Sequence, residues 1–351
     1  MARQQGISIK VAIVTGDDVL DQLSQDTRII ETDRPLSSYA NVISANAYLG
    51  VEAMLPALAA GADVVITGRV ADPSLFLAPM VHHFGWSLDD WPRLGQGTVI
   101  GHLLECVGQI TGGYFADPGK KDVPHLAHLG FPFAEICADG SATIGKVSGT
   151  GGVINCATVK EQLLYEVTDP SAYITPDVVA DFTQVKLIGL GNDRVSVSVS
   201  EGVGRTRTGS YKVSIGYRAG FRGEGEISYA GQNAMARAEL AGHVVSERLR
   251  DDFPDLRVDY IGSTSVHRKS FAPEANPYEI RLRVAALAAM IRQAERIGEE
   301  VEALYTNGPA GGGAARKYVS EVIGIVSALL AREIVSSKVM VLESEPKIEV
   351  I

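Results

Sequence analysis

Apolar residues follow two different periods along this chain, and the period changes from one third of the sequence to the next. The segment 7–16, ISIKVAIVTG, is a β-branched run that ends in glycine and predicts a buried strand. Helical spacing marks 45–62 and 73–85, with the short apolar run ADVVITG at 62–68 between them. A further amphipathic helix is expected at 97–113, where it ends in a glycine pair. Strands and helices that alternate over short connections predict a parallel sheet, which binds its ligands at the carboxyl ends of its strands.

The middle third of the chain alternates with a period of two. Segments 134–147 and 185–220 carry apolar residues at every second position, broken by turn residues such as GNDR and RTGS, and predict antiparallel strands. A long helix is expected next at 233–253, with Pro254 just beyond its end. The last third then returns to alternating elements, namely strand 258–266, helix 281–298, strand 301–309, helix 319–333 and strand 338–344.

Together these elements predict an α/β fold with a mostly parallel sheet flanked by helices and an antiparallel β insertion in the middle of the chain. The expected parts are a first α/β half at 1–134, the insertion at 135–225 and a second α/β half at 226–351. No Pro- or Ser-rich linker separates these parts, so we interpret them as one domain overall.

The composition is that of a soluble globular protein, with 46% hydrophobic and 21% charged residues in a chain of 351. The formal net charge of -10 argues against nucleic acid as a partner, because phosphate binding needs a basic surface. No apolar run reaches the ~18 residues that span a bilayer, and the first residues lack the pattern of a signal peptide. Three cysteines without CxxC spacing predict neither a disulfide framework nor a zinc ribbon, so we expect a cytoplasmic protein.

Two charged residues stand where the expected strand 62–68 gives way to the next helix. Arg69 lies directly after the strand, and Asp72 lies directly before Pro73. Asp72 is placed to cap the helix that Pro73 begins, and it is also a candidate catalytic residue. An arginine can clamp a carboxylate through two parallel hydrogen bonds. The position of Arg69 at the end of a parallel strand therefore predicts a site for an anionic small molecule.

Two glycine-rich turns are candidates for binding phosphate or carboxylate groups. In both, backbone N–H groups can point into a concavity at the start of an expected helix, whose dipole adds positive charge. The first glycine-rich turn precedes a helix expected from Thr158, and the alternative is that it is only a tight turn before that helix. In the second turn, the alternative is that the cations Arg316 and Lys317 lie on a solvated helix face. The candidate binding residues are Gly149, Thr150, Gly151 and Gly152 in the first turn and Asn307, Gly311, Gly312, Gly313 and Arg316 in the second.

Histidine and carboxylate side chains gather between residues 102 and 128. His102 and Glu105 are one helical turn apart, a spacing at which two side chains share a ligand, although a core or surface histidine beside a solvated glutamate has the same spacing. Asp117 is a candidate base in the loop that follows. That loop is either merely polar or a site for a divalent metal, with the candidate ligands Asp122, His125 and His128.

Seven phrases occur in an order that resembles one family. They are VTGDDVL, ANAYLG, GADVVITGRVADPSLFLAP, GHLLECVGQITGGYFADPG, GTGGVINCATVKEQLLYE, TPDVVADF and GEGEISYAG. From about Val11 to Gly313 the chain looks like the acyclic terpene utilisation protein AtuA family, whose members are linked to bacterial breakdown of citronellol- and geraniol-type terpenes. Typical members have a further N-terminal α/β segment, after which this chain begins, and many carry or meet a small C-terminal ferredoxin-like domain.

The resemblance implies a carbon–carbon lyase that cleaves a 3-hydroxy-3-isohexenylglutaryl-coenzyme A to acetate and a shorter acyl-CoA. Such a cleavage needs a base for the tertiary hydroxyl proton and a cation for the departing enolate. We expect Asp117 or His102 as the base, Arg69 on the substrate carboxylate, and the two glycine turns on the phosphates of the thioester.

Two other functions remain open from the sequence. One is a non-catalytic subunit that holds an acyl ligand or a small partner, and the other is a metal-dependent hydrolase that uses the loop from Asp117 to His128. In each case we expect a homo-oligomer, with a small ferredoxin-like protein as a candidate partner subunit.

Overall fold

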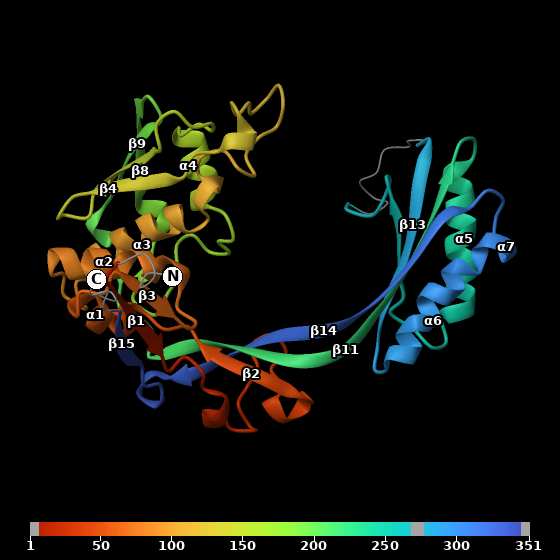
Figure 1. The fold of residues 1–351 in the computed structure, drawn as a ribbon, viewed down its shortest axis with the longest axis horizontal. Coiled ribbons are helices and arrows are strands. Elements are labelled where there is room, and N and C mark those ends of the chain that lie inside the picture. Colours follow the sequence, from red (N-terminus) through yellow and green to blue (C-terminus); the bar gives the residue numbers. More distant parts are fainter. Residues whose placement is uncertain (1–6, 268–276, 345–351) are drawn as a thin grey trace, which may run out of the picture. The chain divides into compact units, whose positions relative to one another are not determined.

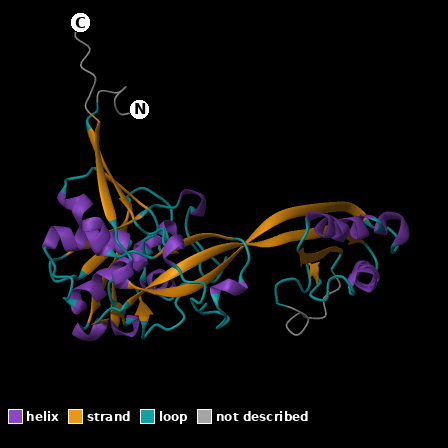
Figure 2. Cartoon of the chain, turned by 90° about the horizontal axis from the view of Figure 1, so that it is seen from below, coloured by secondary structure: helices purple, strands orange, loops and turns teal. Residues whose placement is uncertain are grey.

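The structure is a computed structural model that describes residues 7–267 and 277–344. The chain folds into two units, each built from segments that are distant in sequence (Figure 1). Both units contain helices and strands, which Figure 2 colours purple and orange. The segments of unit 1 are Met1–Leu36, Ser44–Ile215 and Ser327–Ile351, and those of unit 2 are Ser37–Ile43 and Gly216–Val326.

The prediction of a mostly parallel sheet flanked by helices is wrong. The described residues form four sheets, and most of their strand pairs are antiparallel. The error comes from apolar runs whose spacing also fits a helix. The run at 319–333 lies in strand β14 (Gly313–Ala331) or directly after it, and the first half of 281–298 lies in β13 (Glu279–Ala288). Their valines, isoleucines and alanines fit a helical period as well as an extended one, so pairing with distant strands decides between the two.

The sheet nearest to the expected one has the strand order β15-β1-β3 in unit 1. Its central strand β1 (Ile9–Thr15) pairs antiparallel with β15 (Lys338–Ser344) and parallel with β3 (Val64–Thr67). The strands predicted at 7–16 and 62–68 are thus confirmed. Their parallel pairing brings the segments that follow β1 and β3 side by side at one edge of the sheet.

The described residues of unit 1 form four α-helices, of which α1 packs on the sheet, α2 packs on α1 and α3, and α4 packs on α3. Helix α2 ends at Gly85, whose φ of 64° lies in the left-handed region that favours glycine. Helices α2 and α3 pack on each other closely, because a Cβ at Gly101 of α3 would lie 2.5 Å from the Pro73 carbonyl oxygen of α2. The helices are α1 (Val51–Ala59), α2 (Asp72–Phe84), α3 (Trp91–Glu105) and α4 (Cys156–Leu163).

The segments 134–147 and 185–220 contain antiparallel strands, as expected. Residues 210–220 lie in β11 (Ser210–Ala230) of a different sheet, and the other strands of these segments belong to two small sheets of unit 1 with the orders β4-β5-β9-β8 and β10-β7-β6. The first consists of β4 (Pro132–Ile136), β5 (Ala142–Lys146), β9 (Arg194–Val199) and β8 (Val185–Gly191). The second consists of β10 (Gly204–Arg205), β7 (Val179–Ala180) and β6 (Tyr173–Ile174).

Unit 2 is a sheet with helices on one face. Its strand order is β12-β13-β11-β14, where β12 is Arg257–Ile261 and β11 is Ser210–Ala230. Strand β2 (Val42–Ala47) also pairs with β11, and the long strands β11 and β14 contribute residues to both units. The helices are α5 (Ala234–Leu249), α6 (Ile291–Glu302) and the short α7 (Leu304–Asn307), so the strand predicted at 301–309 is wrong.

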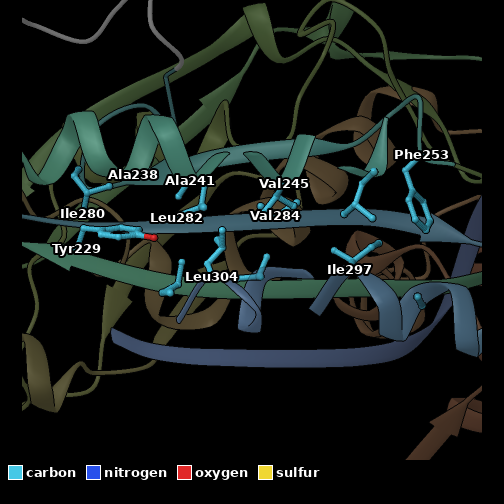
Figure 3. Packing of buried hydrophobic residues seen from close by; sticks show 14 of the residues in the cluster. Tyr229, Ala238, Ala241, Val245, Phe253, Ile280, Leu282, Val284, Ile297 and Leu304 are labelled. Carbon is cyan, nitrogen blue, oxygen red and sulfur yellow. The ribbon is translucent and has the colours of Figure 1, made fainter. Parts of the chain in front are cut away.

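The core of unit 2 lies between this sheet and its helices, and α5 and α6 both pack on β13 (Figure 1). Ala238, Ala241 and Val245 of α5 face the strand residues Leu282 and Val284 (Figure 3). All five side chains are completely buried. Burial of apolar surface on this scale stabilises the unit by the hydrophobic effect.

Candidate functional site

Unit 1 contains a pocket of about 330 Å³ at the start of α2, which we call the α2 pocket. The side chains that line it are aromatic, hydroxyl-bearing and ionisable as well as apolar. Those used below are Tyr48, Asp72, Tyr173, Thr208, Tyr211 and Lys212. The residues come from segments that are far apart in sequence, so the pocket exists only in the folded chain.

The segment after β3 is fixed to the segment after β1 by a carboxylate. Asp17 Oδ2 accepts hydrogen bonds from the Arg69 backbone N–H at 2.8 Å and from Asn46 Nδ2 at 2.9 Å. A Cβ at Gly68 would lie 2.0 Å from Asp17 Oδ1, so this approach requires a glycine. The parallel pair β1–β3 thereby determines where the Arg69 side chain leaves the sheet.

Two cations lie next to one aromatic ring of the pocket. The guanidinium carbon of Arg69 is 5.1 Å from the ring centroid of Tyr48, and Lys212 Nζ is 5.6 Å from the same centroid. Both distances are within the range of cation–π attraction. Arg69 and Lys212 are exposed, and neither has a salt bridge to a described carboxylate. The α2 pocket therefore has two positive charges beside Tyr48 without a salt bridge to a described carboxylate.

Asp72 lies on the pocket wall as the first residue of α2. The sequence placed it as the cap, but Ala71 occupies that position and Asp72 lies in the first turn, where the helix dipole favours a negative charge. Among the residues that the structure describes, its carboxylate has no hydrogen bond or ion pair. An exposed carboxylate without a partner is free to accept a proton from a ligand.

Two phenols of the pocket hold their protons at ordinary pH. Burial raises the pKa of Tyr211 to about 12, helped by its hydrogen bond to Glu52. Burial also raises the pKa of Tyr173, and the charges of Glu105 and Asp72 add to the rise. A phenol that stays protonated is a hydrogen-bond and proton donor rather than a base.

A buried carboxyl group, that of Asp177, holds the segment that lines one side of the α2 pocket. Asp177 follows the lining residues Thr175 and Pro176 and accepts from the Val51 N–H at 2.8 Å and from Ser74 Oγ at 2.5 Å. Burial raises the pKa of Asp177. Because its two partners lie in α1 and α2, Asp177 ties both helix starts to the pocket wall.

A model of a known protein family matches most of the chain. The model of the acyclic terpene utilisation family protein AtuA matches residues 1–341. The chain belongs to the AtuA family. Comparison with curated proteins and with solved structures gave no match.

The family phrases read from the sequence converge on the α2 pocket. The phrase ANAYLG contributes the lining residue Tyr48, GADVVITGRVADPSLFLAP contributes Asp72, and TPDVVADF contributes Thr175 and Pro176. The structure thus brings the three phrases to one pocket. Within the described part of the chain, no helix has both the length and the apolar character needed to cross a membrane.

His102 and Glu105 lie one helical turn apart in α3, but neither lines the α2 pocket. His102 is buried, with Nδ1 2.8 Å from Glu105 Oε1 and Nε2 3.1 Å from the Gln162 carbonyl oxygen. Both neighbours accept hydrogen bonds, whereas a neutral imidazole carries one N–H. The His102 ring packs 5.2 Å from Tyr173, so this pair supports the pocket wall.

The acidic loop after α3 lies apart from the α2 pocket. Asp117 is exposed, 3.7 Å from Lys120 Nζ, and Asp122 accepts from the Gly119 N–H. His125 and His128 are exposed on the same loop. Within residues 7–267 and 277–344, no three His, Cys, Asp or Glu side chains are grouped as metal ligands. Asp122 instead lines a separate pocket of about 930 Å³.

In the first glycine turn, two backbone N–H groups already donate hydrogen bonds within the protein. The Gly151 N–H donates to the His128 carbonyl at 2.8 Å, and the Gly152 N–H donates to the Pro124 carbonyl at 2.7 Å. The following helix begins at Cys156 and is capped by the Asn155 side chain. In this structure those donors are therefore satisfied by backbone and do not point to a ligand.

The second glycine turn belongs to unit 2 and leads into a strand. Gly313 is the first residue of β14, so the helix expected to begin at Arg316 is wrong. Asn307 ends α7, and Gly311 follows the Ala310 carbonyl, which accepts from Arg237 Nη1 at 2.7 Å. Without a helix start, the turn lacks the dipole on which its predicted anion binding depended.

Sequence reasoning missed the aromatic and basic residues that reach the pocket from β6 and β11, Tyr173, Tyr211 and Lys212. They lie in the antiparallel segment, where nothing local marks a site. The phrase ANAYLG was quoted for the family without assigning a role to Tyr48. Reading each family phrase for its most unusual polar or aromatic residue would have found it.

Proposed function

We propose that this AtuA family member is a carbon–carbon lyase that cleaves a branched 3-hydroxyacyl-CoA of the acyclic terpene type in the α2 pocket. The observation that carries the proposal is the unpartnered Asp72 carboxylate in the same pocket as protonated Tyr173 and the cations beside Tyr48. A base, a proton donor and unpaired positive charge are what such a cleavage requires.

The first step assigned to the chain's residues is removal of a proton. Asp72 accepts the proton of the tertiary hydroxyl at C3 of the substrate. The bond between C3 and the neighbouring carboxymethyl carbon then breaks, and its electron pair moves to that carbon. C3 becomes a ketone within a 3-oxoacyl-CoA, and the departing fragment is the enediolate of acetate.

The second step returns a proton to the fragment. Tyr173, whose hydroxyl has no hydrogen bond among the described residues, donates its proton to the carboxymethyl carbon and gives acetate. Protonated Asp72 then restores the Tyr173 phenol, directly or through water, so that no other reactant is consumed. Arg69 and Lys212 stabilise the negative charge that grows on the departing carboxylate.

The pocket also suits a substrate with an apolar branch. Ile174 and Leu329 line it, and both side chains are more than half exposed in the free protein. Exposed apolar groups at a pocket gain free energy when a ligand covers them. An isohexenyl chain would provide that cover.

The test is a product assay with synthetic 3-hydroxy-3-isohexenylglutaryl-coenzyme A. Wild type is expected to release acetate and a 3-oxoacyl-CoA in equal amounts. Arg69→Ala is expected to lower turnover by roughly 10²- to 10³-fold, the effect of removing one donor to a developing anion. Arg28→Ala is the control, because Arg28 is exposed and bonds to Asp33 rather than to the pocket.

Unchanged turnover in Arg69→Ala would refute the assigned role of the pocket. A rise in the thermal midpoint with the thioester, without any product from wild type, would instead identify a non-catalytic acyl-binding subunit.

A further inference from the structure

A second pocket of about 650 Å³ adjoins the α2 pocket within unit 1. Thr208 lines both pockets, so the two lie on either side of one residue. Arg207 and Arg332 line the second pocket together with Trp91 and the hydroxyl side chains of Ser87 and Thr206. We call it the arginine pocket.

The two guanidinium groups share one carboxylate. Arg207 Nη1 lies 2.8 Å from Glu52 Oε2, and Arg332 Nη2 lies 3.1 Å from Glu52 Oε1. Tyr211 also donates to Glu52 Oε1, at 2.8 Å, from the wall of the α2 pocket. Two positive charges against one negative charge leave this network with a net positive charge between the two pockets.

Most of the guanidinium donors remain unused among the described residues. Arg207 makes one hydrogen bond, to Glu52, and Arg332 makes two, to Glu52 and to the Pro176 carbonyl. A guanidinium has five N–H donors in a planar fork that matches phosphate oxygens. Arg332 is also held in place by stacking 4.2 Å from the Tyr211 ring centroid. The donors are thus positioned before any ligand arrives.

Two further side chains define which ligand fits. Trp91 offers an indole ring, half-buried in the pocket wall, on which a planar base can stack. Asp89 is the acidic residue that lines the pocket, and it is exposed and accepts a hydrogen bond from Ser87 Oγ. Because Asp89 faces water, its charge is screened more strongly than those of the half-buried arginines.

We infer that the arginine pocket binds the phosphorylated adenosine end of a coenzyme A thioester, with the phosphates on Arg207 and Arg332 and the base on Trp91. The inference rests on the proposed function, because the acyl end of the same thioester occupies the α2 pocket. It replaces the two glycine turns as the phosphate site, because Gly151 and Gly152 in the first donate to backbone carbonyls and the second leads into a strand. The shared residue Thr208 lies where the linking arm passes.

The inference is tested by calorimetry with adenosine 3′,5′-bisphosphate at low ionic strength, which needs no turnover. Wild type is expected to bind, and Arg207→Gln is expected to weaken the affinity by about tenfold or more, since it removes a charge-assisted contact. Asp89→Asn removes a negative charge that opposes the phosphates, so this variant is expected to bind the bisphosphate more tightly. Arg248→Gln, which changes an arginine paired with Glu300 in unit 2, is expected to bind like wild type.

Inorganic pyrophosphate distinguishes the base from the phosphates. Weaker binding of pyrophosphate than of the bisphosphate by wild type, with the difference lost in Trp91→Leu, supports stacking of the base. Equal binding of the two ligands would overturn the assignment of Trp91. Absence of bisphosphate binding, or the same affinity in Arg207→Gln and wild type, would overturn the pocket itself.

Kinetics separate this inference from the proposed lyase activity. If the enzyme is active, Arg207→Gln is expected to raise KM for the coenzyme A thioester and to leave KM for the corresponding pantetheine thioester unchanged. A lyase whose Arg207→Gln variant shows no such difference contradicts the arginine pocket and leaves the lyase intact. Bisphosphate binding without turnover of either thioester contradicts the lyase and leaves the arginine pocket intact.

Discussion

The charged residues on the sheet of unit 2 and those of the α2 pocket in unit 1 differ in whether they have salt-bridge partners. In unit 2 the charges on the sheet pair with one another: Arg283 binds Glu224 at 2.5 Å and Asp259 at 3.2 Å, and Arg281 lies 3.5 Å from Glu226. In unit 1 the charges of the α2 pocket have no such partners within the described residues. Paired charges contribute to the shape and stability of a fold, whereas unpaired charges in a pocket are available to a ligand.

The difference follows from how each unit is built. Strands β11, β12 and β13 place their charged side chains at neighbouring positions, and Asp259 is the register partner of Arg283. The α2 pocket is instead formed where β3 ends, where α2 begins and where β11 passes. Segment ends have no regular neighbours, so their side chains remain unpaired. We therefore assign the chemistry to unit 1 and a structural role to the core of unit 2.

The largest expected effect on stability is in the core of unit 2. Leu282 is completely buried, and Leu282→Ala is expected to lower the free energy of unfolding by about 2–5 kcal/mol through the lost burial and the cavity left behind. Denaturant unfolding measures the change. Because Leu282 belongs to unit 2 and the α2 pocket is built from unit 1, turnover of the protein that remains folded should not change. A fall in kcat of folded Leu282→Ala would contradict the assignment of catalysis to unit 1 and of a structural role to the core of unit 2.

A smaller effect on stability is expected when the pH is lowered, and it tests the difference between the two units. Burial raises the pKa of Glu52, but hydrogen bonds from Arg207 and Tyr211 outweigh it and keep the pKa below the ordinary 4.5. The pKa of Glu224 in unit 2 is also lowered, by its hydrogen bond with Arg283. A lowered folded pKa stabilises the fold above the unfolded value, and this stabilisation is lost as pH falls through the folded value.

Each carboxylate is therefore expected to contribute less than about 1 kcal/mol at neutral pH, since both pairs are partly screened by solvent. The free energy of unfolding, measured from pH 7 down to about pH 3, should depend less on pH in both Glu52→Gln and Glu224→Gln than in wild type. Ligand binding should change in Glu52→Gln alone. If Glu224→Gln altered ligand binding as much, the two units would not differ in the way described.

The sequence predicted the part of the site that depends on short segments. Strands β1 and β3, helix α2 and the position of Arg69 after β3 are each encoded within one short segment, and local pattern is enough to find them. The role of Asp17 was not visible, because its hydrogen bond to Arg69 depends on the parallel pairing of β1 with β3.

The rest depends on contacts between distant segments. The run at 319–333 fits a helix by its spacing, and only its place beside β11 makes it a strand. The N–H groups of Gly151 and Gly152 are consumed by carbonyls more than twenty residues earlier in the chain, which no motif reveals. Tyr211 and Lys212 reach the pocket from a strand that is more than a hundred residues from Asp72.

The most direct test of the account is acetate release by Asp72→Asn, measured together with binding of the thioester. Asparagine keeps the shape of the side chain but cannot accept the hydroxyl proton, so turnover should fall by about 10²-fold or more. Thermal unfolding and thioester affinity should remain close to those of wild type, since Asp72 has no partner in the described structure. Wild-type turnover in Asp72→Asn would contradict the assignment of the reaction to the α2 pocket.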